Sequence, residues 1–380
     1  MHKHAILADL QLDKKLYGLR ETWEDWFHAL KFATDTIIAR QAEIEAVHFL
    51  GDIFDTEAIG GTAAHAFLSC LKSLEATGKP VFVILGNHDR APYMDVPTWL
   101  DVMTLVNKHV IPLTFDKPYT IKGKKPLTVY GNSFMKSGEL REALKSLPDP
   151  KVEHEVWMVL HQALGELSPN LTDGDLTTED VPAWVNQVFM GDFHDQQGVE
   201  DKLGRKFMYP GAIETVSFNQ KSIPGFILWD RDTKSYEHIV TQQRGYVSVN
   251  LATVAQTDWM KTAVDAVAKA QGEFGRLPVM RIFYPFGTWE AYAPVMEAVK
   301  PTVLKLFDQE LNSTLEGTQA QPSISINPET RDEVRNLAIE LLEPSSDSPK
   351  VDARRLLLRP ENLSDIQKER FPKAVFIPKT

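Results

Sequence analysis

The chain has 380 residues, 43% of them hydrophobic, and a formal net charge of −11 at pH 7. A chain of this length buries a full hydrophobic core, and the length predicts two or three domains. The single cysteine, Cys70, excludes an intramolecular disulfide and indicates a reducing cytoplasm. No apolar stretch approaches the length of a membrane span, so we expect a cytoplasmic protein that does not enter a membrane.

Five short, near-continuous apolar runs predict strands that are buried on both faces. Between the early runs lie two helical patterns, one from Trp23 to Ala33 and one from Ala63 to Leu74. This alternation of strand and helix predicts a layered α/β sheet. The apolar runs are residues 5–8, 47–50, 81–85, 156–160 and 188–190.

A polar block follows each of these runs directly. The functional groups of α/β sheets collect beyond the carboxyl ends of the strands, so the order of the blocks predicts a site. Asp52 lies among apolar neighbours, where a carboxylate is costly to bury unless a cation or a donor satisfies it. Carboxylate, amide and imidazole groups together indicate a cleft that holds two divalent cations. The blocks are Asp9, residues 51–55 (Gly-Asp-Ile-Phe-Asp), residues 86–89 (Gly-Asn-His-Asp), His161 and residues 191–194 (Gly-Asp-Phe-His).

These blocks resemble the motifs of the calcineurin-like metallophosphoesterase superfamily. Gly-Asp-x-x-Asp at residues 51–55 and Gly-Asn-His-Asp at residues 86–89 carry this resemblance. Residues 12–18, 209–218 and 225–230 are similar to segments of the SbcD-type nuclease subunit of DNA double-strand-break repair complexes. The resemblance covers roughly the first two-thirds of the chain. It implies a layered β-sandwich core flanked by helices, with a small α+β capping domain and a helical C-terminal tail.

The resemblance also implies a ligand set for each cation. One cation would be held by Asp9, Gln11, Asp52 and His194, and the other by Asp52, Asn87, His161 and Asp192, so that Asp52 bridges them.

Two of these ligands depart from the family pattern. Gln11 stands where the first motif usually has His, and Asp192 stands where the last motif usually has the first His of Gly-His-x-His. Fewer nitrogens and more oxygens favour Mn²⁺ over Zn²⁺, with Mg²⁺ as the alternative.

His88 and Asp89 are the predicted catalytic residues rather than ligands. The resemblance implies that His88 contacts the phosphate or protonates the leaving oxygen. Asp89, next to it, would orient or charge the imidazole. Loss of His88 should therefore reduce turnover far more than metal binding.

The net charge of −11 conflicts with duplex binding, which normally relies on Lys and Arg to neutralise phosphates. Short basic patches occur at Lys14 and Lys15, at Lys124 and Lys125, and at Arg205. Each is either a DNA contact or a solvated loop. We therefore expect weak autonomous DNA affinity and dependence on a partner protein.

The later part of the chain divides into three segments after a nuclease domain at residues 1–240. Residues 241–310 read as strand, helix, strand and helix, and the resemblance implies the capping domain. Residues 311–327 are polar, with Gly and Pro, and read as a linker. Residues 328–380 are expected to form a helical tail whose apolar positions include Val334, Leu337, Leu341, Leu356 and Leu357.

The tail either packs on its own domain or docks on a partner. By resemblance we favour docking on the coiled coil of an SbcC-type, SMC-like ATPase. The resemblance also suggests a homodimer through helices of the first domain.

The expected function is that of a Mn²⁺-dependent DNA exonuclease (3'-5') and endonuclease that acts on duplex or hairpin ends in DNA recombination and double-strand-break processing. One alternative is a small-substrate phosphodiesterase or phosphatase of the same superfamily. A second alternative, motivated by Gln11 and Asp192, is a weakly active scaffold subunit.

Overall fold

The computed structural model describes residues 2–89, 98–168, 176–271 and 276–311. Its contacts divide the chain into two compact units, residues 1–310 and residues 311–380. The predicted tail, with Val334, Leu337, Leu341, Leu356 and Leu357, lies outside the described residues.

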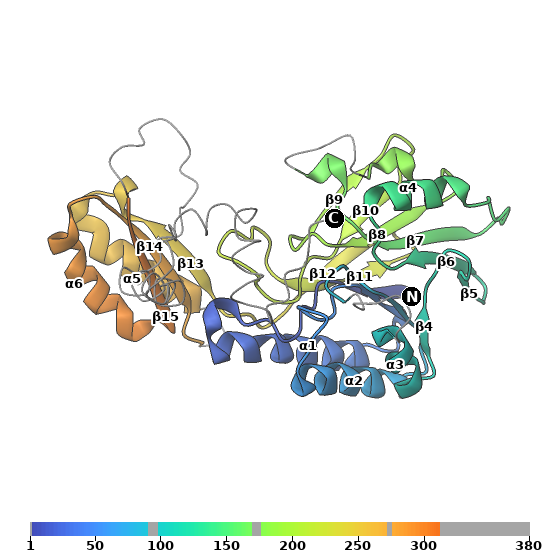
Figure 1. Ribbon diagram of the computed structural model, residues 1–380, viewed down its shortest axis with the longest axis horizontal. Coiled ribbons are helices and arrows are strands. Elements are labelled where there is room, and N and C mark those ends of the chain that lie inside the picture. Colours follow the sequence, from blue (N-terminus) through green and yellow to red (C-terminus); the bar gives the residue numbers. More distant parts are fainter. Residues whose placement is uncertain (1, 90–97, 169–175, 272–275, 312–380) are drawn as a thin grey trace, which may run out of the picture. The chain divides into compact units, whose positions relative to one another are not determined.

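The first sheet has six strands in the order β12-β11-β1-β2-β3-β4 (Figure 1). The strands β1 to β4 run parallel to one another. Beside β1, β11 is antiparallel to it, and the edge strand β12 is antiparallel to β11. The strands are β1 (Lys3–Leu7), β2 (Ile44–Leu50), β3 (Val81–Ile84), β4 (Val110–Pro112), β11 (Gly225–Asp230) and β12 (Ser235–Val240).

The second sheet also has six strands, in the order β5-β6-β7-β8-β10-β9. Its four central strands are parallel, and β5 and β9 are antiparallel edges. The strands are β5 (Tyr119–Ile121), β6 (Leu127–Asn132), β7 (Glu155–His161), β8 (Gln187–Gly191), β9 (Gln197–Glu200) and β10 (Lys206–Tyr209).

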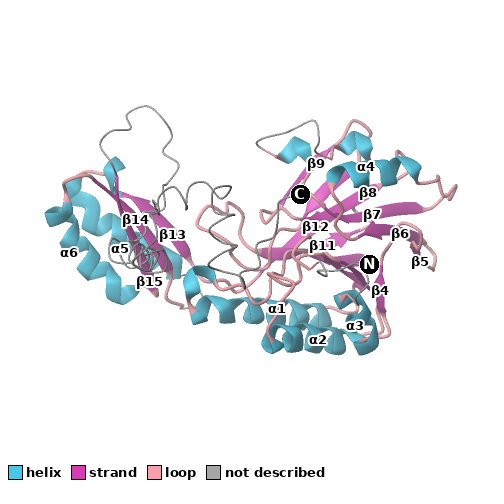
Figure 2. Cartoon of the chain, viewed as in Figure 1, coloured by secondary structure: helices cyan, strands magenta, loops and turns pink. Residues whose placement is uncertain are grey.

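The two sheets pack face to face, and helices cover their outer faces (Figure 2). Ile6 and Phe82 of the first sheet share a buried cluster with Trp157 and Phe189 of the second. Three helices pack on the outer face of the first sheet and one on that of the second. The predicted layered α/β core is therefore confirmed. The four helices are α1 (Arg20–Ala39), α2 (Gly61–Glu75), α3 (Trp99–Val106) and α4 (Ser137–Ser146).

A third, three-stranded sheet follows in the order β13-β14-β15. Its strands are β13 (Tyr246–Asn250), β14 (Val279–Pro285) and β15 (Lys305–Leu311), and α5 (Trp259–Gln271) and α6 (Trp289–Val299) pack against it. The strands and helices expected here are present, whereas a separate capping domain stays a prediction.

Six short 3-10 helices complete the described elements: η1 (Leu16–Gly18), η2 (Gly165–Leu167), η3 (Thr178–Asp180), η4 (Leu251–Thr253), η5 (Gln256–Asp258) and η6 (Lys300–Thr302). Within the part of the chain that the structure describes, no helix has the length and apolar character needed to cross a membrane.

Candidate metal centre

The polar blocks converge at the carboxyl ends of β1, β2 and β3 in one sheet and of β7 and β8 in the other. Backbone hydrogen bonds join the first two blocks, because the Asp9 amide donates to the Gly51 carbonyl (3.1 Å) and the Gln11 amide to the Asp52 carbonyl (2.9 Å). Two neighbouring parallel strands therefore deliver their carboxylates to one place.

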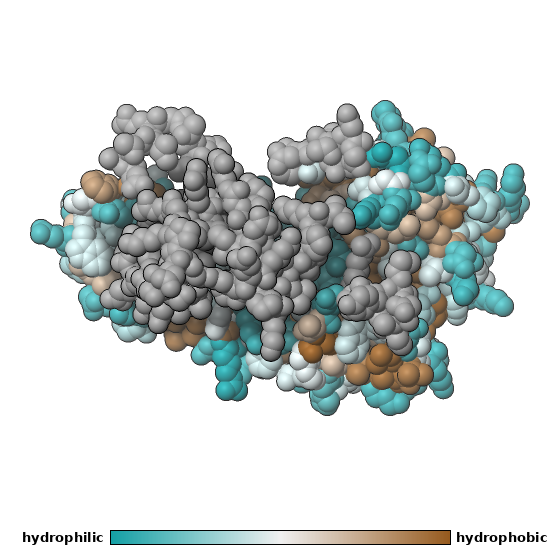
Figure 3. Space-filling view, in the orientation of Figure 1, coloured by the Kyte–Doolittle hydropathy of each residue, from teal (hydrophilic) through white to brown (hydrophobic). Residues whose placement is uncertain are grey.

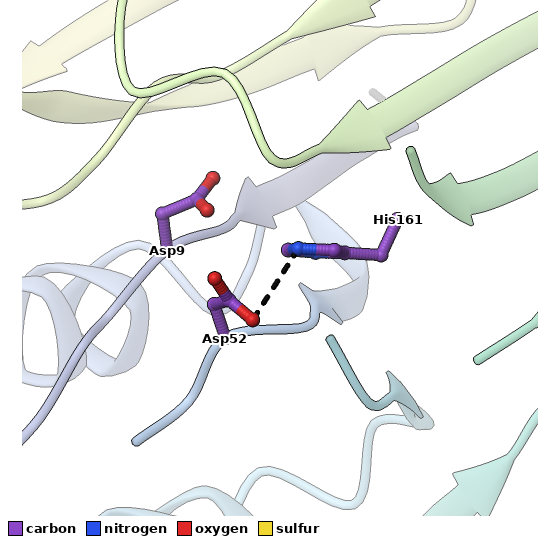
Figure 4. Close-up of side chains that lie close together, drawn as sticks. All are labelled: Asp9, Asp52 and His161. Carbon is purple, nitrogen blue, oxygen red and sulfur yellow. Dashed lines mark ion pairs between the residues drawn. The ribbon is translucent and has the colours of Figure 1, made fainter. Parts of the chain in front are cut away.

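Asp9, Asp52 and His161 form the centre of this convergence (Figure 4). One ligand atom from each lies within 4.8 Å of the others, and all three side chains are buried. The two carboxylates and the imidazole edge point toward one another from three different strands, as a shared cation would require.

His161 presents one ring nitrogen to this cluster. Its Nδ1 donates to the Leu50 carbonyl at 2.6 Å, which fixes the ring and leaves Nε2 facing the carboxylates. Nε2 lies 3.2 Å from Asn87 Oδ1, 3.4 Å from Asp52 Oδ1 and 3.9 Å from Asp192 Oδ1. Ligands of one cation with bonds of about 2.1–2.5 Å lie about 3–3.5 Å apart, so Asn87 and Asp52 already have this spacing and Asp192 is slightly further away.

The other predicted ligand set lies around His194. Its Nε2 is 3.9 Å from Asp9 Oδ1 and accepts a hydrogen bond from the Gln11 amide Nε2 at 2.9 Å. The Gln11 carbonyl oxygen, Oε1, is buried and has no hydrogen-bond partner among the described residues. A buried acceptor without a partner is costly, and a cation beside it would remove that cost.

The electrostatics of the cluster point to missing positive charge. Burial raises the pKa of Asp9 to about 7 and also raises that of Asp192. Burial acts against the charged form of His161, but the hydrogen bond and charge of Asp52, with the charges of Asp9 and Asp192, raise its pKa to about 10. A proton on His161 thus supplies positive charge that offsets the neighbouring carboxylates when no cation is bound. The residues present fit divalent cations with oxygen-rich ligand sets.

The backbone at the site is held in conformations that side chains rarely adopt. Asp9 (φ 50°), Gln11 (φ 39°), Asp52 (φ 48°) and Asp192 (φ 99°) are all left-handed. Such residues cost roughly 1–3 kcal/mol each and cluster at functional sites. Four of the seven predicted ligands therefore lie on strained backbone.

Two glycines allow the ligands to approach one another closely. A Cβ on Gly51 would lie 2.5 Å from His161 Nδ1, and one on Gly86 would lie 2.0 Å from Asp52 Oδ1. Gly51 also has a φ of 89°. A side chain at either position would displace a predicted ligand, which explains the glycine at the start of both motifs.

His88 lies beside the cluster with one nitrogen open. The His88 Nδ1 donates to the Asp55 carbonyl at 2.6 Å. The His88 side chain is 38% exposed, and its Nε2 lies 3.8 Å from Asp52 Oδ2. A group bound above the cluster could therefore reach Nε2. The Asp55 carbonyl, which orients this ring, is a contribution that no side-chain motif could reveal.

Among the described residues, no hydrogen bond joins the Asp89 carboxylate to the His88 ring, so the predicted orienting role of Asp89 stays a prediction. Its carboxylate is buried and accepts hydrogen bonds from three backbone amides: Ile53 (3.0 Å), Phe54 (2.8 Å) and Gly86 (2.9 Å). Burial raises the pKa of Asp89 to about 6, although these amides oppose the shift. Asp89 thus joins the loops that carry Asp52 and His88.

The basic residues predicted to contact DNA have unequal surroundings. The Arg205 guanidinium is buried, pairs with Asp201 at 2.6 Å and donates to three carbonyls, which are surroundings that do not favour the predicted DNA contact. Lys14 pairs with Asp55 at 2.7 Å, and Lys125 pairs with Asp232. Lys15 and Lys124 are exposed and stay predictions.

A pocket of about 210 Å³ opens beside the metal centre. Asp192 and His194 line it from one side, and Ser217, Asn219 and Gln220 line it from the other. The last three residues were not predicted as site residues, although Ser217 lies within the segment 209–218 that carries the resemblance and Asn219 and Gln220 follow that segment. The pocket therefore borders the part of the centre that carries His194.

Comparisons with known proteins agree with this geometry. The family model described as calcineurin-like phosphoesterase matches residues 2–196, which is half of the chain. The DNA double-strand break repair protein Mre11 of Thermoplasma acidophilum is 27% identical over 222 residues, which is 56% of this chain and 56% of that protein. Its namesake from Sulfurisphaera tokodaii is 25% identical over 231 residues, which is 60% of this chain and 57% of that protein.

Two further similarities are more distant. The uncharacterized metallophosphoesterase YhaO of Bacillus subtilis is 23% identical over 273 residues, 68% of this chain and 62% of that protein. The crystal structure of a dimetal phosphatase from Danio rerio has a TM-score of 0.37 and 14% identity, over 56% of this chain and 88% of that one. The chain spans a little over half the length of the curated relatives it matches. With a family model that covers half of its residues, the chain belongs to the calcineurin-like phosphoesterase family.

Proposed function

We propose that this protein is a Mn²⁺-dependent phosphodiesterase that cuts DNA, with 3'-5' exonuclease and endonuclease activity on duplex or hairpin ends. The observation that carries the proposal is the convergence of Asp9, Asp52 and His161 on one buried point, with Asn87 and Asp192 beside them. With Gln11 and His194, these residues would hold two cations, with Asp52 between them. Mg²⁺ is the alternative cation, because oxygen ligands predominate.

The bound cations would lower the pKa of a water and neutralise charge on a phosphodiester. The chain itself supplies His88, whose Nδ1 is fixed by the Asp55 carbonyl. In its imidazolium form, His88 can give the Nε2 proton to the leaving oxygen. Its exposed position beside Asp52 supports this role, and its ring makes no hydrogen bond to Asp89 among the described residues.

Two features support DNA as the substrate. Two relatives carry the name of a DNA double-strand break repair protein, and they match 56% and 60% of this chain. The pocket that contains Asp192 and His194 is not enclosed, so a long polymer need not fit inside a closed cavity.

The partner proposals concern other surfaces. We propose a homodimer through helices of the first domain, because Leu105 on α3 is 86% exposed and the surface over α3 is hydrophobic (Figure 3). We also propose that the tail docks on an SbcC-type ATPase. Truncation near residue 325 tests this docking, since survival of both partner association and phosphodiesterase activity would contradict it.

Cleavage of labelled linear duplex in Mn²⁺ tests the nuclease. We expect degradation by the wild-type protein and by His65→Ala, an exposed histidine on α2 that serves as the control. Asp52→Ala should lose both activity and Mn²⁺ binding, whereas His88→Ala should lose activity and keep Mn²⁺ affinity. Cleavage of cyclic nucleotides or monoesters without duplex cleavage would support the small-substrate alternative. No cleavage with or without an ATPase partner would support the scaffold.

A further inference from the structure

Among the described residues, helices pack on only one face of the sheet β13-β14-β15. Val249, Ile282 and Leu306 pack with α5 and α6 on that face, and these helices lie on one side of the sheet in Figure 1. Because side chains alternate along a strand, the neighbouring positions point away from the helices. We give the name open face to seven of the residues on this side: Tyr246, Ser248, Asn250, Arg281, Phe283, Lys305 and Phe307.

The open face combines aromatic rings with positive charge. Its seven residues include two cations and no carboxylate, although the chain carries a net charge of −11. The acids of β15 lie on the opposite side: Asp308 and Glu310 alternate with Phe307, and Glu310 accepts a hydrogen bond from the Gly287 amide before α6 (2.8 Å). The strand thus separates its charges between the two faces.

The rings and cations of the open face are arranged as adjoining pairs. The Arg281 guanidinium lies between the rings of Phe218 (4.8 Å) and Phe283 (5.0 Å). Lys305 lies over the ring of Phe307 at 5.8 Å. Phe283 is half-buried and meets no other aromatic ring among the described residues. The residue is therefore partly accessible to an incoming flat group, beside the Arg281 guanidinium.

Tyr17 extends this aromatic surface from the core. It contacts Phe307 with ring centroids 4.8 Å apart and Phe218 at 5.4 Å, and it is 39% exposed. Its φ of 56° is a costly conformation for a bulky residue, so the fold holds an aromatic ring at the surface against local strain.

The open face continues to the metal centre. Arg281 Nη2 donates to Asn219 Oδ1 at 3.2 Å, and Asn219 lines the pocket that contains Asp192 and His194. A polymer held on the open face therefore lies next to the centre. Two cations beside several rings match a strand of linked phosphates and flat bases better than they match a small phosphoester.

We propose that the open face, with Tyr17 and Phe218, stacks the unpaired bases of a single-stranded nucleic acid segment at the metal centre. Phe283, Phe307 and Tyr17 supply the ring faces, and Arg281 and Lys305 contact phosphates or stack through the guanidinium plane. This binding site rests on the proposed function, since it selects DNA with unpaired ends as the substrate.

Binding of two fluorescein-labelled strands to the full-length protein tests the proposal. One strand is oligo(dT) of about 12 nucleotides, and the other is an abasic strand of the same length with the same phosphates. Fluorescence anisotropy in EDTA measures affinity without cleavage. The variants are Phe307→Leu and Phe283→Leu, which keep apolar volume, and the control is Phe286→Leu, an exposed ring (60%) just beyond β14. Melting temperatures show whether each variant is folded.

We expect the wild-type protein to bind oligo(dT) more tightly than the abasic strand. Each of the two variants should lose affinity for oligo(dT) by about 5-fold or more, since about 1 kcal/mol or more per stacked base corresponds to this change. Their affinity for the abasic strand, and both affinities of Phe286→Leu, should stay unchanged.

Equal affinity of the wild-type protein for the two strands would overturn the proposal. The proposal would also be overturned if the folded variants lost affinity for oligo(dT) and for the abasic strand by the same factor. Failure of the wild-type protein to bind either strand would also overturn it. Mn²⁺-dependent hydrolysis of bis(p-nitrophenyl) phosphate, measured in the same proteins, separates this result from failure of the proposed function. That function fails if the wild-type protein shows no hydrolysis beyond that of Asp52→Ala.

Discussion

Gly86→Ala is the substitution whose effect follows most directly from the geometry of the metal centre. A Cβ at this position would lie 2.0 Å from Asp52 Oδ1 and 2.4 Å from the Asp52 amide nitrogen. Ordinary van der Waals contact begins at 3.4 Å, so the carboxylate must retreat by about 1.4 Å. Asp52 cannot move alone, because its carbonyl and carboxylate bond the Gln11 and His88 amides.

The displacement is large compared with the tolerance of coordination. Metal–ligand distances vary by about 0.2 Å in sound sites, so a retreat of about 1.4 Å removes Asp52 from both cations. We expect Mn²⁺ affinity to fall at least about 10-fold, and overpacking to lower the free energy of unfolding by about 1–3 kcal/mol. Phosphodiesterase activity should fall with the affinity.

Isothermal titration with Mn²⁺ and urea denaturation measure these two effects. Gly138→Ala on α4 is the matched control, because a Cβ there meets nothing within 4 Å. It should leave Mn²⁺ affinity unchanged and should not destabilise the helix, where Ala is favoured over Gly by about 0.5–1 kcal/mol. A folded Gly86→Ala protein with wild-type Mn²⁺ affinity would show that Asp52 does not bind the cations.

Three other substitutions test separate features. Gln11→His should raise Mn²⁺ affinity at the site near His194 about 10-fold, because imidazole is a stronger ligand than an amide. Titration with Mn²⁺ followed by electron paramagnetic resonance measures this affinity, and an unchanged titration curve would contradict the prediction. Burial raises the pKa of Glu214 from 4.5 to about 8. The folded protein therefore holds a proton that the unfolded chain releases, and the free energy of unfolding of the wild type falls by up to about 1.4 kcal/mol per pH unit as pH rises across this window. Glu214→Gln should remove this loss in urea denaturation, and parallel profiles would refute the assignment. Burial lowers the pKa of His48 well below 6.5, so its neutral form stabilises the fold above pH 6.5 and this stability is lost as pH falls. His48→Phe should reduce this loss of the free energy of unfolding as pH falls. A pH dependence equal to that of the wild type would show that His48 does not cause the loss.

The strands and their polar blocks could be predicted because burial imposes a pattern on the sequence. Apolar runs such as residues 81–85 and 156–160 lie between other layers on both faces, and β3 and β7 form there. The carboxyl ends of parallel strands meet at one edge, so the blocks after them had to come together.

Partners of charged groups could not be predicted, because they depend on how loops pack. Arg205 and Lys15 look alike in the sequence, yet Arg205 is buried against Asp201 and carbonyls whereas Lys15 is exposed. Asp89 follows His88 directly, but its carboxylate turns toward backbone amides of another loop. The open face likewise required strand register, since Ser248 and Arg281 are far apart in the chain.

Anomalous diffraction at the manganese absorption edge, from crystals soaked in Mn²⁺, tests the paired cation centre most directly. We expect two peaks about 3.5–4 Å apart, one on the side of His161 and one on the side of His194, with Asp52 bonded to both. A single peak away from Asp52, or no peak within bonding distance of it, would contradict the two-cation centre.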